Sequence, residues 1–183
     1  ISNNGKTIER NIVKGISHIE NISLINFEGS GMVGVPGFSK RFFGALSQGG
    51  INVIMITQAS SEFSICIAVK ESDAKNAKNL IDKEFEFEIS QKKINHSLIE
   101  SSLSNIAIVG DNMKSKEGVS GKLFSTLGNN NINIRAIAQG ASERNISIII
   151  DAKDNTKALN SLHEAFFENN CKNVHLFITG VGN

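Results

Sequence analysis

The chain has 183 residues, of which 40% are hydrophobic, and its 19 Lys and Arg residues nearly balance its 18 Asp and Glu residues. This length accommodates one large domain or two small ones with packed cores. The sequence has no long block of like charge, which is typical of a nucleic-acid binder. It also has no run of 18 apolar residues, which a membrane-spanning helix requires.

The two cysteines, Cys66 and Cys171, have neither metal-ligand spacing nor the pattern of a disulfide framework. This cysteine pattern predicts a reducing, cytoplasmic setting. From the charge and hydropathy patterns we expect neither a membrane nor a nucleic-acid partner. The first residue is Ile1 rather than Met, and we expect the chain to be a piece of a longer protein.

The first half of the chain predicts the order β-α-β-β-α-β. A short apolar run at 22–27 predicts a strand, and a glycine-rich loop at 28–37 leads to a helix that ends at Gly49-Gly50. Two strands follow at 51–57 and 63–69, and then a helix from Ser72-Asp73 to about residue 83. Phe85, Phe87 and Ile89 alternate with glutamates, which predicts a fourth, half-exposed strand.

The second half repeats this order. A strand at 105–109 precedes a loop at 110–118 and a helix whose apolar face is Val119, Leu123, Phe124 and Leu127. Strands are expected at 132–138 and 144–150, a helix from Asp154 or Asn155 to about Glu168, and a last strand at 174–178. The pattern predicts an α+β fold of two ferredoxin-like βαββαβ modules with antiparallel sheets.

Residues 51–69 and 132–150 are an internal repeat at an offset of 81 residues, with eight of nineteen positions identical. Core packing accounts for the apolar identities but less readily for the polar ones. The repeated Gln58 and Gln139 each offer a hydrogen-bond donor and an acceptor, which suits a ligand hydroxyl. The copies also differ, since Ile54 in the first corresponds to Arg135 in the second, which would crowd or recharge one pocket.

The loop before the first helix of each copy is a second candidate binding element. Each loop carries a methionine, Met32 or Met113, and ends at a glycine, Gly37 or Gly118. Backbone N–H groups at a helix N-terminus can hold a carboxylate, and the side chains of Asn52 and Asn133 can accept hydrogen bonds from an ammonium group. The same loops are equally typical of ordinary turns.

No catalytic constellation emerges from the sequence. The histidines His18, His96, His163 and His175 are scattered, and none pairs with a recognisable nucleophile or carboxylate cluster. We expect no metal and no cofactor in this region. The terminal GVGN at 180–183 lacks the helix and acidic residue of a dinucleotide-binding motif.

The segments INVIMITQASSEFSI and INIRAIAQGASERNISI closely resemble the tandem ACT domains of aspartokinases, especially of bifunctional aspartokinase–homoserine dehydrogenases. Three further segments agree with this resemblance. VKGIS at 13–17 resembles the junction that leaves the kinase domain, VGDNMKSKEGVSGKLF at 109–124 the start of the second ACT domain, and FITGVGN at 177–183 the start of the dehydrogenase nucleotide-binding domain.

The resemblance implies a regulatory, non-catalytic region that binds L-threonine and transmits feedback inhibition to flanking kinase and dehydrogenase domains. It implies that Gln58 and Gln139 contact threonine, with Ile56 and Ile137 nearby. The parent enzyme would use ATP with Mg and NAD(P), and a homodimer would form through the ACT modules. The complete set of predicted ligand-binding residues is Met32, Asn52, Ile56, Gln58, Met113, Asn133, Ile137 and Gln139.

The expected organisation is a kinase junction at 1–20, a first module at 21–90, a linker at 91–103, a second module at 104–172, and the start of the dehydrogenase domain at 173–183. Three alternatives remain open. The first is an aspartokinase region that senses lysine or another amino acid, and the second is an orphan small-molecule sensor. The third, a ferredoxin-like RNA binder, is disfavoured because the chain has no Trp or Tyr for base stacking.

Overall fold

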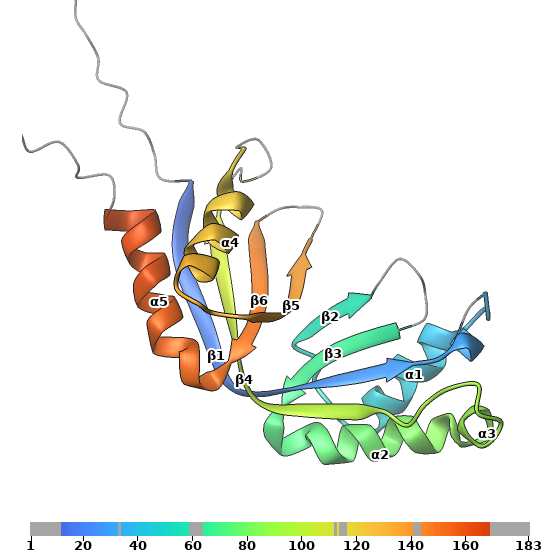
Figure 1. Cartoon of the computed structure of the whole chain (residues 1–183). Helices are drawn as coiled ribbons and strands as arrows, with labels where there is room; N and C mark the ends of the chain where they lie inside the picture. The colour runs from blue at the N-terminus through green and yellow to red at the C-terminus, as the bar shows by residue number, and fades with distance from the viewer. Residues whose placement is uncertain are drawn as a thin grey trace, which may run out of the picture.

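The computed structural model describes residues 12–32, 34–58, 64–111, 113, 117–140 and 144–168. Its centre is a six-stranded antiparallel sheet with the strand order β2-β3-β1-β4-β6-β5 (Figure 1). The strands are β1 (Val13–Glu28), β2 (Met55–Gln58), β3 (Ser64–Lys70), β4 (Leu98–Gly110), β5 (Ile134–Gln139) and β6 (Asn145–Asp151).

The two central strands, β1 and β4, run through the whole sheet and bend halfway (Figure 1). Both bends lie at residues with a left-handed backbone, Asn21 with φ of 56° and Ser102 with φ of 62°. The pairing of β1 with β4 shifts register between Ile19 and Leu24, which indicates β-bulges at the same place. The bend divides the sheet into module one, residues 22–101, and module two, residues 13–20 and 103–168.

Each module has the ferredoxin-like βαββαβ composition, but module two is assembled out of chain order. Its sheet consists of the first part of β1, the second part of β4, β6 and β5, with Val13 paired to Gly110. The first part of β1 therefore completes the sheet of module two beside β4, although it comes first in the chain. In the sequence, module one is inserted between this segment and the rest of module two. The strand expected at 174–178 lies outside the described residues.

This arrangement differs from the expected organisation at two segments. Residues 13–20, interpreted as part of a junction, form the beginning of β1. The linker expected at 91–103 overlaps β4, which begins at Leu98 and passes without interruption from module one into module two. The reason is that β1 and β4 satisfy each other's backbone hydrogen bonds across both modules, so a strand replaces a flexible connection.

The helices follow their apolar periodicity closely. Module one carries α1 (Phe38–Gln48) and α2 (Ala74–Glu84), and module two carries α4 (Val119–Asn129) and α5 (Asn155–His163), which continues as a π-helical turn at Glu164–Glu168. In the second strand of each repeat the observed start is later than expected, at Met55 and Ile134.

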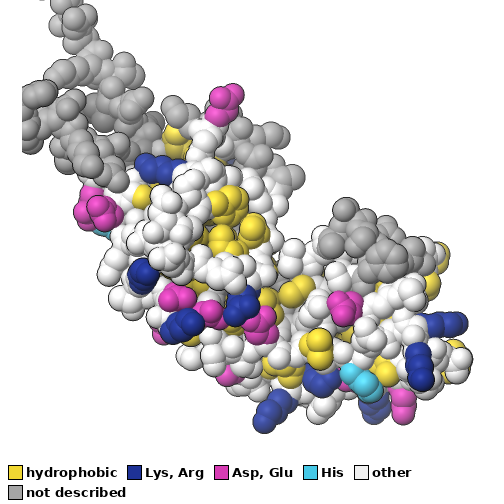
Figure 2. Space-filling model, viewed as in Figure 1, with side chains coloured by type: hydrophobic (Ala, Val, Ile, Leu, Met, Phe, Trp, Pro, Cys, Tyr) yellow, Lys and Arg dark blue, Asp and Glu magenta, His cyan; other side chains and the backbone are white. Residues whose placement is uncertain are grey.

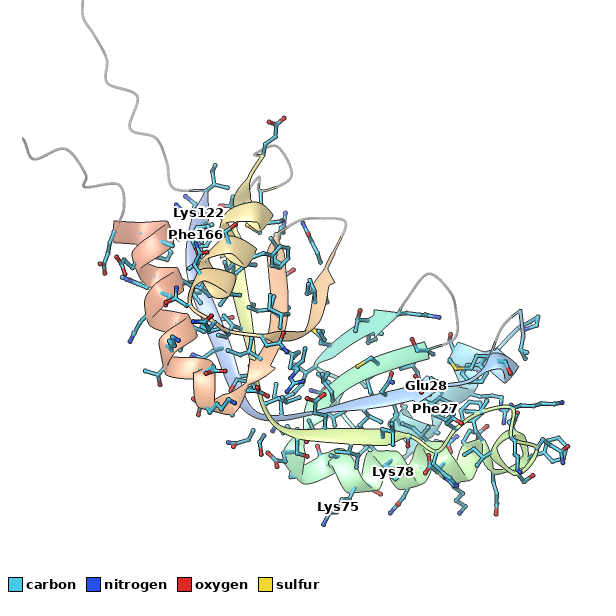
Figure 3. All side chains as sticks on the ribbon, in the orientation of Figure 1. Phe27, Glu28, Lys75, Lys78, Lys122 and Phe166 are labelled. Atoms are coloured by element: carbon cyan, nitrogen blue, oxygen red, sulfur yellow. The ribbon has the colours of Figure 1, made fainter. Side chains whose placement is uncertain are left out.

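The fourth strand predicted at Phe85–Ile89 is wrong, because Glu86–Ser90 is the short helix α3. Phe85 is fully buried, with its ring centroid 4.5 Å from that of Phe38 and 5.0 Å from that of Phe27 (labelled in Figure 3), whereas Phe87 is 70% exposed. Arg41 on α1 covers the Phe85 ring at 4.4 Å and forms ion pairs with Glu84 and Glu88. These tertiary contacts favour a helical turn over the strand that alternation alone predicts.

The structure has three apolar cores, one within each module and one between them. One lies between α1, α2 and the sheet of module one, and a second lies between α4, α5 and the sheet of module two, where Lys122 and Phe166 also pack together (Figure 3). The third is on the helix-free side of the sheet and joins the modules. Its buried members come from both modules: Ile22, Leu24, Met55, Ala68, Leu103 and Ile149. The helices therefore lie on the outside, while the bent sheet faces itself.

A polar cluster around Asp82 fixes α2 to the start of β4. The Asp82 carboxylate accepts hydrogen bonds from the Ser97 backbone N–H at 2.9 Å and the Ser97 hydroxyl at 2.6 Å, pairs with Lys78 (Figure 3) at 2.7 Å, and lies 3.1 Å from the His96 ring. Burial acts to raise the pKa of Asp82, but the hydrogen bonds from Lys78, Ser97 and His96 outweigh it and hold that pKa below its usual value.

We expect Asp82→Ala to lower the free energy of unfolding at pH 7 by about 2–3 kcal/mol, because it leaves the buried Ser97 N–H and hydroxyl without their acceptor and removes the carboxylate that pairs with Lys78. The exposed Glu71 on the preceding turn is the control, and Glu71→Ala should change the value by less than about 0.5 kcal/mol. Urea denaturation measures both.

The effect of Asp82 should also depend on pH. Because the folded pKa lies below the unfolded one, the carboxylate stabilises the fold above the unfolded value of about 4, and this contribution is lost as the pH falls through the folded pKa. The difference between wild type and Asp82→Ala should therefore shrink in acid. A difference that stays constant from about pH 7 to pH 3 would contradict this account.

Candidate functional site

The glycine-rich loop of module one forms one wall of a cavity of about 500 Å³. Gly37 adopts a left-handed backbone, with φ of 81°, and directly precedes α1. Met32 and Gln58 both line this cavity, together with Gly34, Val35, Pro36, Gly37, Phe38, Ser39 and Ile65. Met32 itself is buried in the aromatic core, so its side chain supports the wall of the cavity.

Module two repeats this loop in its key conformational feature. Gly118 has φ of 87° and precedes α4 as Gly37 precedes α1, and Met113 is buried in the core like Met32. Residues 112 and 114–116 of this loop lie outside the described part of the chain. The repeated helix starts place positive helix ends at matching positions of the two modules.

A second cavity, of about 520 Å³, lies between the edge strands β2 and β5. We call it the edge cavity. Because the sheet is bent, β2 and β5 approach each other although they are its opposite edges (Figure 1). The edge cavity brings together four of the predicted ligand residues, Ile56, Gln58, Ile137 and Gln139. The two isoleucines are 50% and 44% exposed, and both glutamines are exposed at strand ends.

Gln58 thus belongs to both cavities, the one at the glycine-rich loop and the edge cavity. The sequence predicted one site in each module, with one glutamine in each. The structure instead brings both glutamines to one cavity between the modules, and adds the α1 N-terminus on one side of Gln58. The ligand-binding role of these residues stays a prediction.

Asn52 and Asn133 are exposed just before β2 and β5 and line neither cavity. Sequence reasoning also missed Pro36 and Ser39 as lining residues of the loop cavity. The chain's one proline, next to Gly37, was the available signal, because a Pro-Gly pair marks a turn of defined shape.

Both cavities are uncharged. None of the described residues that line them is Lys, Arg, Asp or Glu. Polar groups come from glutamine, serine, threonine and asparagine side chains and from the backbone at the start of α1. Such a lining suits a small ligand whose own side chain is neutral.

Within the described ranges, no three His, Cys, Asp or Glu side chains are grouped so that they could hold a metal ion. His18, His96 and His163 lie near single carboxylates, Glu20, Asp82 and Glu168 respectively. No helix in the same ranges has the length and apolar character that crossing a membrane requires.

A bent sheet that joins two βαββαβ modules, with small uncharged cavities along its edge strands, is the arrangement of a tandem ACT-domain protein. A family model of the ACT domain matches the chain twice, over residues 25–85 and 106–166. The chain belongs to the ACT domain family, and the predictions of two ACT modules and of an antiparallel α+β fold are confirmed.

Among known proteins, the chain is similar to bifunctional aspartokinase/homoserine dehydrogenases. It is 42% identical to that of Haemophilus influenzae over 170 residues, which cover 93% of this chain and 21% of that protein. It is 44% identical to the chloroplastic enzyme of Daucus carota over 155 residues, covering 85% of this chain and 17% of that one. The chain thus spans about a fifth of the length of these relatives.

Solved structures agree with this assignment. The ligand-free regulatory subunit of aspartate kinase from Thermus thermophilus has a TM-score of 0.71 and 27% identity, covering 84% of this chain and 99% of that one. A structure of aspartokinase alpha and beta subunits has a TM-score of 0.70 and 28% identity, covering 84% and 98%. The chain therefore matches the regulatory ACT region of such enzymes.

The left-handed backbone at Gly37 predicts a specific cost of substitution. Nothing lies within 4 Å of a Cβ built there, so Gly37→Ala should destabilise the chain only through its backbone, by about 1 kcal/mol. Gly37→Asn should cost less, because Asn tolerates this conformation. Gly44 within α1 has equal space, and Gly44→Ala should instead stabilise by about 0.5–1 kcal/mol.

Urea denaturation of the three variants measures these differences in the free energy of unfolding. Equal effects of Gly37→Ala and Gly37→Asn would contradict the conformational explanation, because that explanation separates the two residues only by their tolerance of positive φ.

Proposed function

We propose that this chain is an amino-acid-sensing regulatory region that binds L-threonine and mediates feedback inhibition of aspartokinase and homoserine dehydrogenase activities in a longer parent protein. The observation that carries the proposal is that Gln58 and Gln139, equivalent residues of the internal repeat, line one cavity between the two modules. The similarity to bifunctional aspartokinase/homoserine dehydrogenases over most of the chain supports it.

The lining of the cavities fits the chemistry of threonine. A glutamine amide both donates to and accepts from a hydroxyl, and an analogue without that hydroxyl would leave the amide unpaired. Ile56 and Ile137 offer apolar contact to the threonine methyl group. Next to Gln58, the N-terminus of α1 supplies backbone N–H groups and a favourable dipole for the ligand carboxylate.

The same lining argues against lysine. A lysine side chain carries a second ammonium group, in addition to the α-ammonium that every amino acid has, and a buried side-chain charge is normally paired with an opposite charge. The described residues that line the loop cavity and the edge cavity include no Asp or Glu. A neutral hydroxyl side chain is therefore favoured over a cationic one, and the remaining alternative is another neutral amino acid.

Inhibition follows if threonine binds one arrangement of the two modules better than another, because a ligand shifts a conformational equilibrium only by its difference in affinity. In the parent protein the regulated domains would be a kinase that uses ATP with Mg and a dehydrogenase that uses NAD(P). The proposal includes a homodimer through the ACT modules.

Isothermal titration calorimetry of the 183-residue chain with L-threonine, L-lysine, L-methionine and L-isoleucine tests the ligand. We expect heat of binding with threonine and a much weaker response to lysine. Gln58→Ala and Gln139→Ala should each weaken threonine binding by about tenfold, which corresponds to about 1.4 kcal/mol for a lost amide hydrogen bond. The absence of a threonine signal at millimolar concentration would refute the ligand assignment.

Gln48 provides a matched control, because it is an exposed glutamine at the end of α1 that lines neither cavity. Gln48→Ala should bind threonine like the wild type. If all three glutamine variants weaken binding equally, the effect is a general loss of stability, and the roles of Gln58 and Gln139 are excluded.

A further inference from the structure

A third cavity, of about 660 Å³, lies between the helix-free face of module one and strand β5 of module two. We call it the cleft cavity. Module one contributes side chains from β1, β2, β3 and β4, among them Leu24, Asn26, Cys66 and Glu100, while module two contributes Arg135 and Ile137. The cleft cavity adjoins the edge cavity at Thr57 and Ile137, but neither Gln58 nor Gln139 lines it.

Arg135 is held in a defined position at this cavity. Its Nε lies 3.2 Å from Glu100 Oε1 of module one, and its Nη2 lies 3.2 Å from Asp151 Oδ1 of module two. Arg135 also lies at the register shift between β5 and β6, where a bulge redirects a side chain out of the regular alternation. The guanidinium therefore links the two modules, and its Nη1 has no protein partner among the described residues.

Asn26 and Glu100 of module one offer hydrogen-bond acceptors at the same cavity. The Asn26 amide donates from Nδ2 to Glu28 at 3.2 Å, which fixes the amide and leaves its Oδ1 as an acceptor. Glu100 uses Oε1 for Arg135, and Oε2 forms no bond with the described residues. A positively charged donor, a negatively charged acceptor and a neutral amide acceptor thus line one cavity.

The floor of the cleft cavity is apolar. Leu24 is only 4% exposed, and Ala136, Ile137 and the Cys66 thiol complete this surface. Burial, aided by the charge of Glu100, raises the pKa of Cys66 to about 11, so the thiol stays neutral at pH 7. Cys66 is partly buried in this floor and lines the cavity together with Glu100.

A simple anion in this cavity would meet Glu100, and a simple cation would meet Arg135. A zwitterion satisfies both groups, because each of its charges meets an opposite charge. We propose that the cleft cavity is a second ligand site, separate from the glutamine-lined cavities, for an α-amino acid with an apolar side chain. Its carboxylate accepts from Arg135 Nη1, its ammonium group donates to Glu100 and Asn26, and its side chain packs on Leu24 and Ile137.

Occupancy of this site would contact both modules at once. A ligand bound between Glu100 and Arg135 stabilises the mutual arrangement in which the two residues face each other. The site therefore gives a second metabolite a means to favour one bend of the sheet, in addition to any ligand of the edge cavity.

Cys66 is a built-in reporter for the site. Alkylation of Cys66 by iodoacetamide, followed at about pH 9 by mass spectrometry of its peptide, separates it from Cys171. We expect saturating L-leucine, L-isoleucine, L-valine or L-methionine, at least one of the four, to slow alkylation of Cys66 by about tenfold, because the bound ligand blocks access to the thiol. No protection by any of them would overturn the proposal.

Variants assign the protection to the cleft cavity. Arg135→Ala and Glu100→Gln should each abolish the protection of Cys66. Protection is measured as the ratio of alkylation rates with and without ligand, so that any change in the pKa of the thiol cancels. Arg144→Ala, at an exposed arginine just before β6 that does not line the cavity, should keep the full effect. Thermal unfolding checks that each variant is folded, and Glu100→Gln serves alone if Arg135→Ala unfolds. Protection that persists in the folded variants would refute the site.

The double variant Gln58→Ala/Gln139→Ala separates this site from the threonine site. It should lose threonine binding and retain full protection of Cys66 by the apolar amino acid. If protection disappears together with threonine binding, the ligand acts through the edge cavity, and a separate cleft site is excluded. If threonine fails to bind the wild type but an apolar amino acid still protects Cys66, the proposed function fails and the cleft site stands.

Discussion

The antiparallel pairing of β1 with β4 is the constraint on which the structure depends, because among the described strands these two alone belong to both modules. Left-handed residues at Asn21 and Ser102 bend both strands at the same level, and the apolar surface at the bend then closes on itself. The sheet edges β2 and β5 meet as a consequence. Both the edge cavity and the cleft cavity exist because of this bend, and Figure 2 shows charged side chains of both signs over the region between the two modules.

Local sequence patterns predicted most elements but not their assembly. The apolar faces of α1 and α4 and the alternation in β3 are encoded within a few residues, so they could be found without knowledge of partners. The pairing of Val13 with Gly110 joins segments far apart in the sequence, and nothing within VKGIS distinguishes a strand from a junction. Phe85 shows the opposite failure, since a clear strand-like alternation yields to packing on Phe27, Phe38 and Arg41.

The sequence likewise identified residues of the candidate site but not how the fold brings them together. Repetition of Gln58 and Gln139 identified them, because core packing does not require a repeated polar residue at the end of an edge strand. Their meeting in one cavity depends on the bend, which no local pattern encodes. Arg135 was noticed as a departure from Ile54, but the expectation that it would crowd a glutamine pocket assigned it to the wrong surroundings. It instead pairs with Glu100 across the modules.

The insertion of module one determines how the two modules are connected. Val13 at the start of β1 and Glu168 at the end of the last helical turn both belong to module two (Figure 1). The β1–β4 bend and the apolar core on the helix-free side of the sheet are the main described contacts that join module one to module two. The edge cavity and the cleft cavity have walls from both modules, whereas the described lining of the loop cavity comes from module one alone. The two repeated segments therefore share one fold, but only the second belongs to the module in which the described part of the chain begins and ends.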